Sequence, residues 1–297
     1  MPILATEKTA VADSELATAN FCLRTVFHEA VGAPDSGLLQ RAFDHHFSMP
    51  GAQRRARLAL QTSAALQLSP RDSAQIAAAI ELLHNASLVQ DDFQDRSNFR
   101  RGQAAVWAEF GDAAAIGLAN CLISATFLCV SRIPHPHCLP QLIAAVNAAI
   151  TETTHGQITD LANPSVSTPG IDAVIASAGF KSGPLFALAL TLPLILAGRG
   201  DALLTAQAAA RDFGIGYQIV DDLDDFESDR DSGLGLNLIL VLRKQASLAG
   251  AVQQGSALAV RHLNDARAQA ARLPDHAGNG LIALTDGLLA KVAFPNG

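Results

Sequence analysis

The stretch LLHNASLVQDDFQD, residues 82–95, closes an apolar helical pattern with three aspartates, and YQIVDDLDD, residues 217–225, repeats that ending. Both endings read D-D-x-x-D, and their aspartates are Asp91, Asp92, Asp95, Asp221, Asp222 and Asp225. On a helix, each set of three lies within an arc of about 100°. The carboxylates of one turn repel one another, so each turn requires a counter-charge.

Hard divalent cations are the counter-charge that suits these carboxylates. Mg²⁺ accepts oxygen ligands, keeps several waters and favours phosphate as a further ligand. A single acidic turn is a weak signal, because most such turns lie on solvated helix faces. Here both turns continue apolar helices, so we expect the carboxylates to face inward, where they are costly without cations. Two facing turns therefore predict a site for several metal ions around a polyphosphate.

The composition provides for a large core and limits the class of partner. Of the 297 residues, 49% are hydrophobic and 16% are charged. The formal net charge of −7 argues against nucleic acid or an anionic membrane as the main partner. An anionic substrate would then need local clusters of basic residues or metal ions.

The cysteines and the N-terminal residues favour a cytoplasmic protein. None of Cys22, Cys121, Cys129 and Cys138 forms a CxxC pair, which favours reduced and mostly buried thiols over disulfides. The first residues contain no basic segment leading into an apolar one, so no secretory signal is predicted. Residues 113–130 carry no charge, but their small and polar residues favour a buried helix over a membrane span.

The spacing of apolar residues predicts an all-α protein. They recur at helical intervals, as at Ile76, Ile80 and Leu83, and alternating β-branched runs are scarce. Prolines and glycines are sparse between stretches long enough for helices. No change of composition marks a linker, so we expect a single domain over residues 1–297.

Basic residues flank the acidic turns. Arg54 and Arg57 lie three positions apart and share a helix face, and Arg100 and Arg101 follow the first acidic turn. Lys181 precedes another apolar helix. The forked donors of arginine and the point charge of lysine suit diphosphate oxygens.

Together, these elements resemble the trans-isoprenyl diphosphate synthases of the polyprenyl synthetase family. The matching segments, in the family's order and spacing, are AQRRAR (52–57), LLHNASLVQDDFQD (82–95), FRRG (99–102), GQITDL (156–161), KSG (181–183) and YQIVDDLDD (217–225). The resemblance implies one large orthogonal helix bundle around a deep central cavity, the isoprenoid synthase fold, usually as a homodimer. Its most similar members are geranylgeranyl and polyprenyl diphosphate synthases.

The resemblance also implies an activity and roles for residues. The family joins isopentenyl diphosphate head to tail to an allylic diphosphate, and the six aspartates would hold about three Mg²⁺ ions. The residues matching the grip on the allylic diphosphate are Arg100, Lys181, Ser182 and Gln218. Isopentenyl diphosphate must not ionise, so its site would use side-chain cations instead of metal. The residues matching that site are Arg54, Arg57, His84 and Arg101.

Four positions depart from the family pattern. Arg54 stands where a lysine is usual, Trp107 where histidine is frequent, and Asn98 where an acid is frequent. The fourth departure is a missing cation: the family has a lysine after the second acidic turn, whereas residues 231–242 contain none. Arg230 or Arg243 could substitute for it.

Product length follows from the residues before the first acidic turn, which in this family lie near the cavity floor. Ala86 and Ser87 are small, whereas an aromatic residue there would close the cavity to longer chains. We therefore expect a product of about twenty carbons or more.

Two other functions remain open. A class I terpene cyclase also ionises allylic diphosphates, but has no use for Arg54, Arg57, His84 and Arg101. A non-catalytic subunit of a heterodimeric synthase should have eroded acidic turns, whereas both are whole here.

Overall fold

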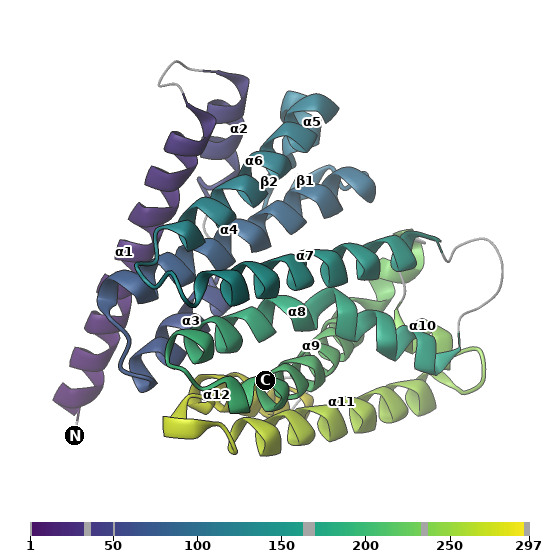
Figure 1. Ribbon diagram of the computed structural model, residues 1–297. Coiled ribbons are helices and arrows are strands. Elements are labelled where there is room, and N and C mark those ends of the chain that lie inside the picture. Colours follow the sequence, from purple (N-terminus) through teal and green to yellow (C-terminus); the bar gives the residue numbers. More distant parts are fainter. Residues whose placement is uncertain (1, 33–36, 50, 163–169, 233–236, 294–297) are drawn as a thin grey trace. The chain divides into compact units, whose positions relative to one another are not determined.

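The computed structural model describes residues 2–32, 37–49, 51–162, 170–232 and 237–293, without the side chains of residues 2–12, 160–162 and 227–232 (Figure 1). Over these ranges the only strands are two of two residues each, β1 (Phe99–Arg100) and β2 (Gln103–Ala104). The other elements are helices, which confirms the all-α prediction. The described residues group into two compact units, which are presented one at a time below.

The first unit comprises Met1–Val146 with Ile195–Ala197. Its helices are α1 (Pro2–Val31), α2 (Leu38–His46), α3 (Arg54–Ala65), α4 (Pro70–Gln94), α5 (Val106–Phe110) and α6 (Asp112–Ser131). Helix α4 is central, since it packs against α1, α3, α5 and α6 (Figure 1). Ser69 caps its N-terminus by accepting the Asp72 backbone N–H at 3.1 Å, and Pro70 occupies the first turn, where its missing N–H costs nothing.

The second unit comprises Asn147–Leu194 with Gly198–Gly297. Helices α7 (Leu139–Ala162) and α8 (Ile171–Leu196) contribute to both units. The remaining elements are η1 (Gly200–Ala202), α9 (Leu203–Ser232), α10 (Leu238–Leu242), α11 (Leu248–Ala270), η2 (Pro274–His276) and α12 (Asn279–Ala293). Helix α9 packs against α10, α11 and α12.

Glycines let α8 approach two neighbouring helices closely, namely α7 and α9, the helix that carries the second acidic turn. A Cβ built at Gly214 of α9 would lie 2.6 Å from the backbone nitrogen of Gly183 on α8. A Cβ at Gly156 of α7 would lie 2.9 Å from Cβ of Phe180 on α8. Both contacts are closer than side chains allow, so these helices meet backbone to backbone.

Helices α6 and α8 are both long and apolar enough to cross a membrane, a property that core helices share. The most apolar window is 78% buried in α8 but only 50% buried in α6. The helix predicted to be buried at residues 113–130 is therefore covered on one side, with Ile116 among its exposed residues. The four cysteines are free thiols. The single domain and the central cavity remain predictions.

Candidate active site

The first acidic turn closes α4, with Asp95 as the C-cap. Asp92 is 2% exposed and is held by Arg100, whose Nε lies 3.0 Å from Oδ1 and 3.1 Å from Oδ2, while Nη2 lies 2.5 Å from Oδ1. Burial raises the pKa of Asp92, and the hydrogen-bonded guanidinium offsets part of that rise. Asp91 and Asp95 are half-buried and add to the negative field that keeps Arg100 charged.

A tight hairpin presents Arg100 and Arg101 beside this turn. Strands β1 and β2 pair Phe99 with Ala104 and Arg100 with Gln103. The two residues between the strands, Arg101 and Gly102, have φ angles of 53° and 81°, as a type I′ turn requires. The hairpin therefore directs one arginine to the acidic turn and places the next at its tip.

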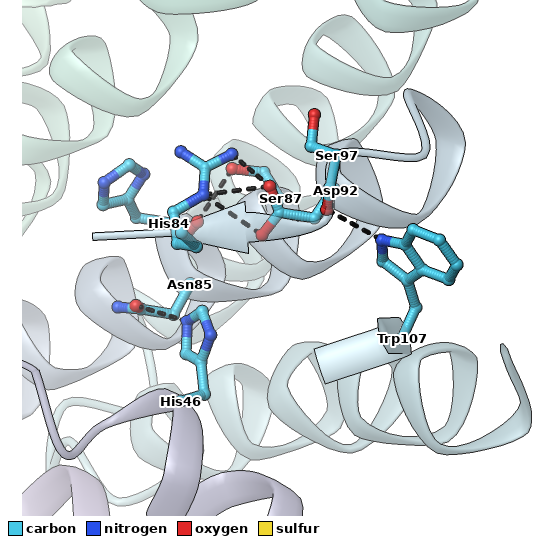
Figure 2. A network of polar contacts seen from close by, with 8 residues as sticks. His46, His84, Asn85, Ser87, Asp92, Ser97 and Trp107 are labelled. Atoms are coloured by element: carbon cyan, nitrogen blue, oxygen red, sulfur yellow. Dashed lines mark hydrogen bonds and ion pairs between the residues drawn. The ribbon is translucent and has the colours of Figure 1, made fainter. Parts of the chain in front are cut away.

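Aromatic residues fix the segment between α4 and the hairpin. The guanidinium of Arg96 lies 4.6 Å from the ring centroid of Phe93 and 5.0 Å from that of Trp107, and it pairs with Asp112 at 2.7 Å. Trp107 donates its indole N–H to the Ser97 carbonyl at 2.9 Å (Figure 2). The tryptophan that departs from the family pattern therefore anchors the loop that follows the acidic turn.

Two arginines and a histidine gather at the neighbouring turn of α4, and we call Arg55, His84 and Arg101 the cationic cluster. Arg55 of α3 approaches His84 Nε2 at 3.2 Å, and burial, followed by the charges of Arg55 and Arg101, lowers the pKa of His84 well below its usual value. His84 is therefore neutral at pH 7, with Nε2 accepting the bond from Arg55. Arg101 donates to the Met49 carbonyl at 3.1 Å and lies directly over Gly51.

A series of buried, hydrogen-bonded polar side chains adjoins the cationic cluster on α4. His46 Nε2 lies 2.9 Å from Asn85 Oδ1 (Figure 2), and Asn85 donates to Oε1 of Glu81 at 3.1 Å. All three residues are at most 4% exposed. Burial raises the pKa of Glu81, and the hydrogen bond from Asn85 and the charges of Arg55 and Arg101 offset part of that rise.

The four residues expected at the isopentenyl diphosphate site are thus only partly brought together. His84 belongs to the cationic cluster, and the charge of Arg101 lowers its pKa. In contrast, Arg57 is exposed and pairs with Asp13 at 3.1 Å. Arg54 is also exposed, at the first residue of α3. Arg55, which lies between the two matching arginines in the sequence, contacts His84 instead. Its proximity to His84 depends on how α3 packs on α4, which residue spacing does not reveal.

In the second unit, hydrogen bonds tie the second acidic turn to its neighbours. Asp222 is 4% exposed; its Oδ1 accepts from Gln218 at 3.1 Å and its Oδ2 accepts from the Leu238 backbone N–H at 2.8 Å. Ser182 of α8 donates to Gln218 Oε1 at 3.4 Å. Asn237 caps α10 and also donates to the Asp222 carbonyl at 3.0 Å. Ser182 and Gln218, two of the residues predicted to grip the allylic diphosphate, are thus linked by hydrogen bonds to Asp222 of the acidic turn.

The remaining predicted residues vary in exposure. Lys181 and Asp221 are half-buried, whereas Asp225 is exposed. Ala86 is fully buried, and Ser87 donates its hydroxyl to the His84 carbonyl at 2.8 Å (Figure 2). Arg230 and residues 233–236, part of the stretch without lysine, lie outside the described side chains.

The donor atoms of both turns fit a hard divalent cation, because each turn offers only carboxylate oxygens. Within the described residues, no three metal-binding side chains converge on one point. Asp92 and Asp222 are already engaged by Arg100 and by the α10 N-terminus. An ion at either turn would therefore take further ligands from water or substrate, which is the habit of Mg²⁺.

Comparison with protein-family models matches residues 36–236 to the family described as polyprenyl synthetase, which is more than half of the chain. Among curated proteins, the chain is similar to the (2E,6E)-farnesyl diphosphate synthase of Mycobacterium tuberculosis, with 31% identity over 174 residues. The match covers 58% of this chain and 48% of that protein, so the chain spans about half the length of this relative.

Solved structures share the fold over almost the whole chain. A geranylgeranyl pyrophosphate synthetase from the archaeon Geoglobus acetivorans superposes with a TM-score of 0.80 at 24% identity, covering 92% of this chain and 98% of that one. A polyprenyl synthase from Caulobacter crescentus, complexed with calcium and isoprenyl diphosphate, gives a TM-score of 0.79 at 19% identity, covering 95% and 96%. At these identities the superpositions establish the fold alone.

Proposed function

Because the chain belongs to the polyprenyl synthetase family, we propose that it is a prenyltransferase that condenses isopentenyl diphosphate head to tail with an allylic diphosphate. The observation that carries this proposal is the pairing of two unlike anion sites along α4. The acidic turn with Arg100 suits a diphosphate that arrives with cations and leaves. The cationic cluster of Arg55, His84 and Arg101 has side-chain cations of its own and suits a diphosphate that stays attached.

The residues at the acidic turn would assist departure of the allylic diphosphate. Arg100 is only partly exposed and is kept charged by the neighbouring carboxylates. In that position its forked donors stabilise the charge that develops on the leaving oxygens. In the second unit, Lys181, Ser182 and Gln218 would contribute further donors to the same group.

We propose Mg²⁺ as the cofactor, held by Asp91, Asp92 and Asp95 of the first acidic turn and by Asp221, Asp222 and Asp225 of the second, with about three ions in all. When bound, the ions supply positive charge to the departing diphosphate. The Caulobacter crescentus structure, with calcium and isoprenyl diphosphate, supports a divalent ion in this fold.

The cationic cluster would bind isopentenyl diphosphate and leave its C–O bond intact. His84 is neutral, so the grip depends on the guanidinium groups of Arg55 and Arg101. A new carbon–carbon bond forms between the allylic cation and the isopentenyl double bond, and the released diphosphate takes the proton that is then lost. No separate base is required. Apolar residues of the helices would keep water from the cation.

We further propose a cytoplasmic homodimer that makes a product of about twenty carbons. The small residues Ala86 and Ser87 support a long product, and the farnesyl and geranylgeranyl synthases named above differ in the products that their names give. The half-covered α6, with Ile116 at 49% exposure, supports pairing with a second copy.

A single assay separates this proposal from its competitors. The purified protein is incubated with isopentenyl diphosphate, Mg²⁺ and each allylic primer in turn, and the products are identified by mass. Elongated diphosphates are expected. Hydrocarbons would indicate a terpene cyclase, and inactivity with every primer would indicate a non-catalytic subunit.

A further inference from the structure

The second acidic turn lacks the lysine that family members carry shortly after it, and the structure shows which basic residue lies nearby. Arg243 at the end of α10 is exposed, with no ion pair to the turn among those described. A different cation, Lys291 on α12, forms an ion pair with Asp224 inside the second turn. The partner comes from the last helix, 67 positions along the chain.

The position of Lys291 follows from how α12 packs. Helix α12 contacts both α9 and α11, and Arg267 of α11 pairs with Asp286 of α12 at 3.3 Å. Asp286 lies five residues before Lys291, so the helix is held along the same stretch that carries the lysine. The hydrogen bond to Asp224 raises the pKa of Lys291, and the charges of Asp224 and Asp221 add to this rise. Its ammonium group is therefore charged and within the field of Asp221.

Asp224 lies outside the arc of the three motif aspartates, but it adjoins Asp221. Residues three apart share a helix face, so Asp224 and Asp221 are neighbours on α9. Asp224 therefore holds the ammonium group at the edge of the turn without using one of the three motif carboxylates. Lys291 is about half exposed, and such surface ion pairs bind weakly, so the lysine can exchange Asp224 for a stronger anion.

We propose that Lys291 is a diphosphate-binding residue, which supplies from the C-terminal helix the cation that is missing after the second acidic turn. This assignment rests on the proposed function of that turn. Lysine suits the task, since its compact charge on a flexible stem can follow a diphosphate as it binds and leaves. Asp224 is the positioning residue that keeps the ammonium group there beforehand.

Calorimetry with inorganic pyrophosphate and Mg²⁺ tests this assignment without requiring turnover. Lys291→Ala should weaken the Mg²⁺-dependent binding of pyrophosphate about tenfold, the loss expected for one charged donor to an anion. Lys291→Arg should recover most of the affinity. Asp224→Asn should weaken binding less than Lys291→Ala, because the lysine stays present but loses its tether.

Arg267→Ala is the matched control. It breaks an ion pair of similar exposure that also holds α12, but Arg267 is not paired with the acidic turn. It should leave pyrophosphate affinity unchanged. The Lys291 assignment is wrong if Lys291→Ala binds pyrophosphate like the wild type, or if Arg267→Ala weakens binding equally. A wild-type protein that binds pyrophosphate but elongates no primer would refute the proposed function and leave the Lys291 result valid.

Discussion

At the residue scale, the cationic cluster depends on the small Gly51 and on the neutral state of His84 as much as on its arginines. Gly51 leaves room for the guanidinium of Arg101, because a Cβ at that position would lie 2.4 Å from Nη2 and 2.6 Å from Cζ. His84 accepts a hydrogen bond from Arg55 only because burial keeps its imidazole neutral.

Gly51→Ala should impair binding of isopentenyl diphosphate with little effect on stability. The added methyl group would displace the end of a flexible side chain rather than backbone, so Arg101 would move and lose its bond to the Met49 carbonyl. We expect the KM for isopentenyl diphosphate to rise about tenfold, as for loss of a charged hydrogen bond, with the KM for the allylic primer unchanged. Steady-state kinetics with each substrate varied in turn measure both constants. Equal increases in the two would contradict the assignment of Arg101.

His46 should make the protein sensitive to mild acid. Burial lowers its pKa from 6.5 to about 4, with Asn85 opposing and the charges of Arg101, Arg100 and His45 adding to the decrease. A folded-state pKa below the unfolded value means that the unfolded chain binds the proton first. The stabilisation is therefore complete above pH 6.5 and is lost as the pH falls toward 4.

Between pH 7 and pH 5, this linkage amounts to about 2 kcal/mol of unfolding free energy. His46→Gln keeps a donor for Asn85 but does not titrate, so it should lose about 2 kcal/mol less than the wild type over that range. Urea denaturation at both pH values measures the difference. Equal losses in the two proteins would mean that His46 can be protonated while folded.

At the element scale, the crossing of α8 and α9 is the contact that positions Ser182 beside Gln218. The backbones meet at Gly183 and Gly214, one turn from this hydrogen bond, and the rings of Phe186 and Phe213 pack beside it with centroids 4.7 Å apart. No local pattern in either helix distinguishes these glycines from others, because the requirement arises only when the helices pack.

The same substitution should have opposite effects at two helical glycines. At Gly214 a methyl group would meet the Gly183 backbone at 2.6 Å, so Gly214→Ala should destabilise the protein by about 2 kcal/mol or more. At Gly287 of α12 the added carbon would have nothing within 4 Å, so Gly287→Ala should stabilise the protein by about 0.5–1 kcal/mol. Chemical denaturation of both variants gives the two values. A tolerated Gly214→Ala would mean that α8 and α9 are less closely packed.

Product length provides a test of α4. Ala86 is fully buried, so Ala86→Phe should shorten the product if the predicted cavity extends past this position. The mechanism is steric, because the ring would occupy the path of the growing chain. Mass spectrometry of the products from one primer measures the length. If that variant does not fold, Ser87→Phe at the half-buried neighbouring position replaces it. A folded, active variant with unchanged products would disprove the assignment of the cavity floor.

At the scale of the whole molecule, sequence patterns predicted what depends on local spacing and missed what depends on packing between distant segments. Helical periodicity predicted the all-α fold, and the acidic turns stood out because both end apolar stretches. The sequence offered no prediction for the arginine that contacts His84: helical spacing places Arg54 and Arg57 on one face, and the orientation of α3 brings Arg55 to α4. Lys291 carried no local signal at all.

The proposed function also requires that both acidic turns bind one diphosphate, which a mutant cycle can test. Asp91→Asn with Asp95→Asn removes charge from the first turn, and Asp221→Asn with Asp225→Asn does so in the second. Both pairs spare the buried Asp92 and Asp222, whose hydrogen bonds support the fold. The readout is the rise in Tm on adding Mg²⁺ and inorganic pyrophosphate.

At ligand concentrations about 100 times Kd, the wild type should gain about 2.7 kcal/mol, or roughly 5 °C in Tm. If one diphosphate bridges both turns, each pair of substitutions should abolish most of this rise, and combining the pairs should cost little more. Two independent sites would instead contribute separately to the rise in Tm, so the losses caused by the two pairs of substitutions would add. Additive losses would therefore refute a shared site, and with it the mechanism in which both turns act on a single leaving group.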